Sequence, residues 1–241
     1  MERTESVYIL KDMELALLLS LSGMKELYGF KMNDVQNPDR TAIYQTLFEL
    51  EKSGFLIFRG NGEMEISPET EAVLENIRNA GKILLYCSME AKYPDQCIYL
   101  GDEAVFVCAC TVPGGRYRIR RVLREELPEE ICACGFWLEG FVDDQSLYKE
   151  ERIENAGLEK KAEELFERAP SIWREETGCI TDCLRVVSPD NRRCIRQYLL
   201  MKEGLNDYFA VTDKDGTTLY GYAGRKVVEA LRKETEINLS K

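Results

Sequence analysis

CLRVVSPDNRRCIRQYLLMKEGLNDYFAVTDKDGTTLYGYAGRKVVEALRK, residues 183–233, is the stretch that decides the fold of this chain. Turn-forming segments (Ser-Pro-Asp-Asn, Gly-Leu-Asn and Asp-Lys-Asp-Gly) separate four runs rich in Val, Ile, Leu and aromatic residues. These runs predict strands at residues 183–187, 193–202, 207–212 and 217–222. A helix is expected after Gly224, because Val227, Val228 and Leu231 share one helical face. The stretch therefore predicts an antiparallel meander whose apolar face is covered by a helix.

The same order of elements is expected earlier in the chain. Strands are predicted at residues 82–87, 96–100, 104–111 and 116–123, followed by a short helix from about residue 128. The starts of corresponding strands are offset by 101, 97, 103 and 101 residues, although the two segments share almost no residue identity. We interpret this as a structural duplication. The alternative is that an antiparallel α+β protein simply contains two unrelated meanders.

The N-terminal part has the element order of a winged helix. Helices are expected at residues 13–21, with Asp12 as candidate cap, and at 40–53. A hairpin at residues 55–58 and 63–66 follows, and Ser67-Pro68 begins a third helix that ends near Gly81. The second helix is expected to present one apolar face, made of Ile43, Tyr44, Leu47, Phe48 and Leu50.

A winged helix usually binds DNA, but the charge of this segment opposes that function. Residues 1–80 contain eight Lys or Arg against fourteen Asp or Glu, a net charge of −6. Phosphate contacts need cations. We therefore expect a helix-hairpin unit that packs on the sheet, and keep DNA binding as the alternative.

The complete prediction is an α+β protein with antiparallel sheets in two pseudo-twofold-related meander-plus-helix halves, preceded by a winged-helix-like unit. The expected divisions are 1–81 for the N-terminal unit, 82–134 for the first half, 135–180 for a connecting segment and 181–241 for the second half, all in one compact body. Within the connecting segment, the charged residues 143–155 are expected to be a solvated loop or exposed helix, and residues 158–169 an amphipathic helix.

Composition narrows the class of partner. The 241 residues carry a net charge of −11, which disfavours nucleic acid or an anionic membrane as the main partner. The apolar run at residues 15–21 is too short to span a membrane, and no run of 18 apolar residues occurs. We expect a cytoplasmic protein with no membrane insertion.

The absence of histidine removes the commonest general base and most zinc-ligand sets. Of the nine cysteines, Cys87, Cys97, Cys108, Cys110 and Cys194 fall in apolar strand patterns and are expected to be buried free thiols. We therefore expect no enzymatic activity, no metal site and no cofactor. An enzyme that uses acidic residues or a cysteine remains the least favoured alternative.

Two groups of residues are candidates for partner binding. Arg116, Arg118 and Arg120 alternate along one predicted strand, and arginine binds carboxylates bidentately. An aromatic and apolar cluster follows, made of Phe136, Trp137, Leu138 and Phe141. The arginines are either a solvated face or a docking surface for an acidic helix or loop, and the cluster is either core or part of that surface.

Several stretches together form a family-like pattern: residues 13–18, 47–56, 66–68, 117–122 running into 125–128, and the final hairpin with its closing helix. Their order resembles that of the EspG family, which are cytosolic chaperones of type VII (ESX) secretion. The resemblance implies a pseudo-twofold α+β body without catalytic residues, which binds a helical secreted protein or protein pair and keeps it soluble. The competing interpretation is a winged-helix transcriptional regulator with an α+β ligand-sensing domain.

Overall fold

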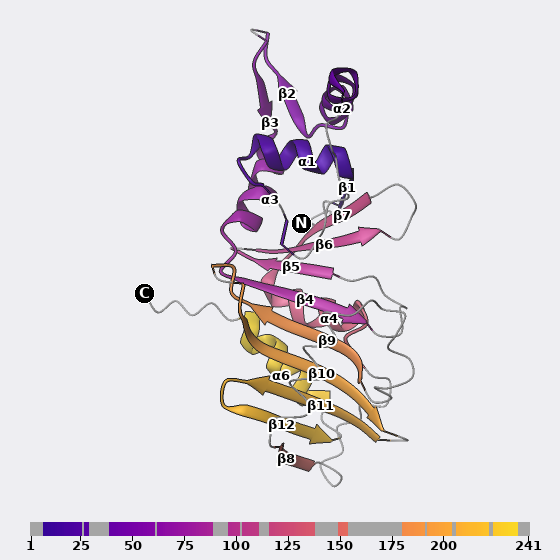
Figure 1. Ribbon diagram of the computed structural model, residues 1–241, viewed down its shortest axis with the longest axis vertical. Helices are drawn as coiled ribbons and strands as arrows, with labels where there is room; N and C mark the ends of the chain where they lie inside the picture. Colours follow the sequence, from indigo (N-terminus) through magenta and orange to yellow (C-terminus); the bar gives the residue numbers. More distant parts are fainter. Residues whose placement is uncertain are drawn as a thin grey trace. The chain divides into compact units, whose positions relative to one another are not determined.

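The computed structural model describes residues 7–25, 27–28, 39–60, 62–88, 96–101, 103–110, 116–137, 149–153, 180–190, 192–203, 206–221 and 224–235 (Figure 1). The chain forms two compact units, Met1–Gly81 with Gln96–Val122, and Lys82–Asp95 with Leu123–Lys241. Both contain helices and antiparallel strands, so the predicted α+β class is confirmed. The four-part division remains a prediction.

The first unit contains three helices and six strands among its described residues. They are β1 (Val7–Lys11), α1 (Asp12–Leu21), α2 (Arg40–Lys52), β2 (Leu56–Phe58), β3 (Met64–Ile66), α3 (Pro68–Arg78), β5 (Gln96–Leu100), β6 (Ala104–Cys110) and β7 (Arg116–Val122). Strands β2 and β3 pair as the predicted hairpin. The remaining strands lie in the order β1-β7-β6-β5. The predicted order of helices and hairpin is confirmed, whereas its assignment as a winged helix remains a prediction.

Local signals in the sequence explain the ends of α2. The Asp39 carboxylate accepts a hydrogen bond from the Ala42 N–H (2.6 Å), which caps the first turn. Gly54 ends the helix with φ of +77°, a conformation that costs glycine little. For α1 the expected cap was wrong, because the helix begins after Lys11 and Asp12 lies in its first turn. There the Glu14 carboxylate accepts from the Lys11 N–H (2.7 Å).

The buried face of helix α2 differs from the apolar face predicted for it. Leu50 and Thr46 are its buried residues, whereas Tyr44 is 71% and Phe48 63% exposed. The expected apolar face is therefore only partly covered. Thr46 tolerates burial because its hydroxyl donates to the Ala42 carbonyl (2.9 Å).

The sheet of the first unit has two different faces. On the covered face, Leu10, Tyr117 and Ile119 are buried, and α1 packs against β7. Helix α3 packs against β5 and β6 through its buried stripe of Val73, Leu74 and Ile77. The period of two along each strand places the alternate residues of β1 and β7 on the opposite face.

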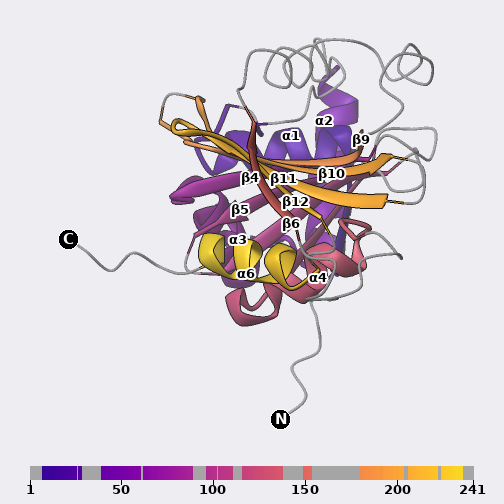
Figure 2. The same cartoon turned by 90° about the horizontal axis from the view of Figure 1, so that it is seen from below.

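The second unit is built on a six-stranded antiparallel sheet in the order β4-β9-β10-β11-β12-β8. Its elements are β4 (Lys82–Ser88), a 3₁₀ turn η1 (Arg124–Glu126), α4 (Leu127–Ala133), β8 (Lys149–Ile153), β9 (Ile180–Val187), β10 (Cys194–Glu203), β11 (Asn206–Asp213), β12 (Gly216–Gly221) and α6 (Gly224–Thr235). Helices α4 and α6 contact each other and lie on the same side of the sheet (Figure 2). Of the face predicted for the last helix, Val227 and Leu231 are buried and Val228 is half-buried.

The eight meander strands predicted from turn signals are all present, with ends that differ by a few residues at most. Strands β9 to β12 pair consecutively, and so do β5 to β7. Their relation by a twofold axis remains a prediction.

Two further strands were not predicted. One is β1, which pairs with β7. The other is β8, which pairs with β12 inside the stretch 143–155 that was expected to be a loop or helix. The charged sequence Lys-Glu-Glu-Arg-Ile did not indicate a strand, although an edge strand can be highly charged.

The burial expected for the cysteines holds for Cys97 but not for Cys194, which is exposed on β10. Cys87 is half-buried. The side chains of Cys108 and Cys110 and the amphipathic segment 158–169 lie outside the described residues.

The turn between β5 and β6 approaches α3 so closely that it requires glycine. A Cβ atom on Gly101 would lie 2.7 Å from the Asn76 backbone oxygen, which cannot move away like the end of a side chain. The Asn76 side chain also accepts a hydrogen bond from the Glu103 N–H (3.0 Å), so the turn is fixed against the helix.

We expect Gly101→Ala to lower the free energy of unfolding by about 1–3 kcal/mol, because backbone atoms must shift to admit the methyl group. The matched control is Gly60→Ala, where a Cβ meets no atom within 4 Å and where the change should stay within about 0.5 kcal/mol. Urea denaturation of both variants measures the difference. Equal stability of the two variants would contradict the close approach.

Candidate functional site

The predicted arginines lie on one face of the β1–β7 strand pair. The register opposes Arg116 to Lys11, Arg118 to Ile9 and Arg120 to Val7. Directly opposed residues of paired strands project to the same side of a sheet. We call these six residues the basic face.

Most of the basic face is open to solvent. Arg116 and Arg118 are exposed, Arg120 is half-buried, and Ile9 and Val7 are 57% and 41% exposed. An exposed apolar pair beside a row of arginines is suited to a partner segment with both apolar and acidic side chains. Sequence analysis found the arginines but missed Val7 and Ile9, because their place beside β7 depends on a pairing across more than a hundred residues.

The cations of the basic face differ in how they are neutralised within the chain. Lys11 bonds the Glu49 carboxylate (2.6 Å) and lies 3.5 Å from that of Glu14, and these contacts raise its pKa. In the part of the chain that the structure describes, no carboxylate forms an ion pair with Arg116 or Arg118. Their guanidinium groups are therefore positioned to bind carboxylates of another molecule.

The predicted aromatic cluster is only partly described. Phe136 is fully buried in the second unit, where its ring meets that of Tyr86 edge to face at 6.1 Å. Trp137 is half-buried beside it, and Leu138 and Phe141 lie outside the described residues. The arginines belong to the first unit and Phe136 to the second. Phe136 contributes to the core of its unit, so of the two cluster residues that the structure describes only Trp137 keeps an exposed surface.

The second unit contains a cavity of about 320 Å³ between α6 and strands β10, β11 and β12. Its charged and aromatic lining includes Arg196, Asp213, Tyr220, Lys226, Glu229 and Lys233. Three rings cross its floor, since Phe209 stacks on Tyr198 at 5.8 Å and on Tyr220 at 6.1 Å. Sequence analysis did not single out this cavity.

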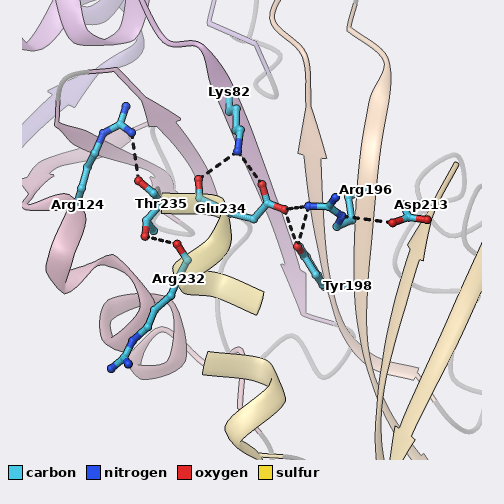
Figure 3. A network of polar contacts seen from close by, with 8 residues as sticks. All are labelled: Lys82, Arg124, Arg196, Tyr198, Asp213, Arg232, Glu234 and Thr235. Carbon is cyan, nitrogen blue, oxygen red and sulfur yellow. Dashed lines mark hydrogen bonds and ion pairs between the residues drawn. The ribbon is translucent and has the colours of Figure 1, made fainter. Parts of the chain in front are cut away.

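A buried carboxylate bonds two of the residues that line this cavity, Arg196 and Tyr198 (Figure 3). Glu234, near the end of α6, is 2% exposed and receives three side-chain donors. Tyr198 donates its hydroxyl at 2.6 Å, Lys82 its ammonium at 3.0 Å, and Arg196 its guanidinium. These donors come from β10 and β4, so one side chain of α6 is bound to two strands of the sheet.

The donors decide the protonation state of this group. Burial by itself would raise the pKa of Glu234, but the hydrogen bonds from Tyr198 and Lys82 and the charges of Lys82 and Arg196 outweigh it and lower that pKa. Burial and the neighbouring carboxylate raise the pKa of Tyr198, so its phenol keeps its proton. Glu234 is thus an anion whose acceptor positions are occupied, an arrangement that holds a helix rather than one that moves protons.

No described group of three His, Cys, Asp or Glu side chains is arranged to hold a metal ion. No helix in the described ranges is both long and apolar enough to cross a membrane.

Comparison with known proteins gives a likeness of fold. No protein-family model and no curated protein sequence matches the chain. Among solved structures, the chain is similar to the type VII secretion system chaperone EspG5 of Mycobacterium tuberculosis, which was solved in complex with a PE25–PPE41 dimer. The TM-score is 0.53, and the alignment covers 95% of each chain at 7% sequence identity. The fold suggested by the sequence resemblance is therefore supported along nearly the full length.

The Glu234 contacts predict a destabilised Glu234→Gln variant, because the amide leaves Lys82 and Arg196 without their buried counter-charge. We expect a loss of about 3 kcal/mol in the free energy of unfolding at pH 7. Glu229→Gln is the control, since Glu229 is exposed and, among the described residues, its ion pair is with Lys226 one turn away, at 3.4 Å. That change should cost less than about 0.5 kcal/mol.

The difference between parent and Glu234→Gln should also depend on pH. The pKa of Glu234 is lower in the folded than in the unfolded protein. Such a carboxyl contributes its full stabilisation of the folded state when the pH is above its unfolded pKa of about 4.3. This contribution is lost as the pH falls through the folded pKa. Chemical denaturation at pH 7, 5 and 3 should show the two proteins converging towards acid pH. A constant difference over this range would show that Glu234 contributes through packing alone.

Proposed function

We propose that this chain is a non-enzymatic cytoplasmic chaperone or adaptor that binds helical substrates of a type VII (ESX) secretion system. The observation that carries the proposal is the likeness to EspG5 across 95% of both chains. The EspG5 structure contains a dimer of two other proteins. By analogy, the partner of this chain is a helical secreted protein or a pair of such proteins.

The basic face supplies the chemistry for this role. The chain is acidic overall, so a cluster of exposed cations on β7 is a local exception that favours an acidic partner. Val7 and Ile9 add apolar area, which usually gives an interface most of its affinity, while the arginines fix the register of the partner. We place the client on this face, as an amphipathic helix with carboxylates along one edge.

Co-expression tests the proposal. The full chain is produced together with small helical proteins, singly and in pairs, encoded beside a type VII secretion ATPase in its own genome. A soluble complex that survives size-exclusion chromatography, formed by a client that precipitates alone, is the expected result. If every such protein fails to form a complex, or if the chain instead shifts DNA from its own promoter region, the chaperone function is wrong.

The double variant Arg116→Glu with Arg118→Glu tests the assignment of the face. Both side chains are exposed, so we expect the protein to stay folded and to bind its client at least about tenfold more weakly. Lys25→Glu with Lys214→Glu is the matched control, because it changes the net charge equally at exposed sites elsewhere. Titration calorimetry at two salt concentrations measures both effects, and parent binding should weaken as salt increases. Equal losses in the two double variants would make the basic face a solvated surface.

A further inference from the structure

Helix α2 presents an exposed apolar surface, and the neighbouring strand β2 carries further exposed apolar residues, that the proposed function does not use. The exposed large apolar residues there are Tyr44 and Phe48 on the helix and Ile57 and Phe58 on the neighbouring strand. Helix α2 contacts β2 and α1 through its other side, where Thr46 and Leu50 are buried. Four such residues on two adjacent elements are more than the scattered single exposures that are normal for a soluble monomer.

The charges beside these aromatic residues follow a pattern. Arg40, Tyr44, Phe48 and Glu51 succeed one another at spacings of four, four and three residues, so they form one stripe along α2. A cation stands at the first turn of this stripe and an anion at the last, with the two rings between them. Neither Arg40 nor Glu51 makes an ion pair within the described residues. When two copies of this stripe lie antiparallel, the cation of each copy therefore meets the anion of the other.

We propose that this surface binds a second copy of the same chain through an antiparallel pair of α2 helices. A twofold axis level with Gln45 and Thr46 sets Arg40 of each copy against Glu51 of the other, and Tyr44 of each copy against Leu47 and Phe48 of the other. Isologous pairing of this kind repeats every favourable contact twice. The aromatic centre and charged ends match the usual arrangement of an apolar core with a polar rim. The pairing is independent of the proposed chaperone function.

Other occupants are less well matched to the stripe. A purely acidic segment would meet Glu51 as well as Arg40, and a purely basic segment would meet Arg40 as well as Glu51. A second copy satisfies both charges at once. The helix is also long enough, since 13 residues rise through about 20 Å and hold the whole stripe.

Analytical ultracentrifugation of the full chain, up to about 0.1 mM, tests the proposal. We expect a reversible monomer–dimer equilibrium that Phe48→Glu weakens at least tenfold while circular dichroism stays unchanged. Ile195→Glu is the matched control, because Ile195 is an exposed apolar residue on β10, in the other compact unit, and it should leave the dimer unchanged. A monomer at every concentration, or a dimer that Phe48→Glu does not weaken, overturns the proposal.

A charge exchange tests the antiparallel register separately. Arg40→Glu and Glu51→Arg, made singly, each place like charges together and should weaken the dimer about tenfold. The double variant restores opposite charges in both contacts and should recover the parent dissociation constant to within about threefold. Stronger dimerisation by the single variants than by the double variant would overturn the antiparallel arrangement.

Discussion

The second unit depends on the burial of one carboxylate at an unfavourable place. Glu234 lies in the last turn of α6, where the helix dipole disfavours an anion. Its burial would cost several kcal/mol without partners. Lys82 and Arg196 supply the counter-charges, and Lys82 also bonds the Glu234 carbonyl (3.3 Å), while Arg124 bonds that of Thr235 (3.3 Å). Cations from three elements thus bond both the Glu234 side chain and two carbonyls of the helix end.

This constraint shows where sequence analysis succeeds and where it fails. The strands of the two meanders could be predicted because each is bounded by its own turn residues, a local signal. The role of Glu234 could not, because it stands in a charged run typical of a solvated helix end, and its partner Lys82 is 152 residues away in the sequence. The same reason applies to β1 and β8, which became recognisable as strands only through their pairing with β7 and β12.

Helix α2 illustrates a second limit. Its apolar residues predicted the helix correctly, yet periodicity alone could not say which of them the rest of the unit would cover. Tyr44 and Phe48 belong to the predicted apolar face and are exposed, whereas the polar Thr46 is buried with its hydroxyl bonded inside the helix. An apolar face that exceeds the covered area is a feature that only the packed structure shows, and it is where a surface for another molecule can be sought.

The likeness to EspG5 at 7% identity follows from the same physics. A fold requires a pattern of apolar positions, turns and helix ends, and many sequences satisfy one pattern. A binding surface instead requires particular side chains, such as Arg118 opposite Ile9, and a shared fold does not preserve them. The partner of this chain must therefore be sought through the charges and apolar residues of its own surfaces. For the proposed client, the exposed Arg116 and Arg118 on an acidic protein favour segments with complementary carboxylates.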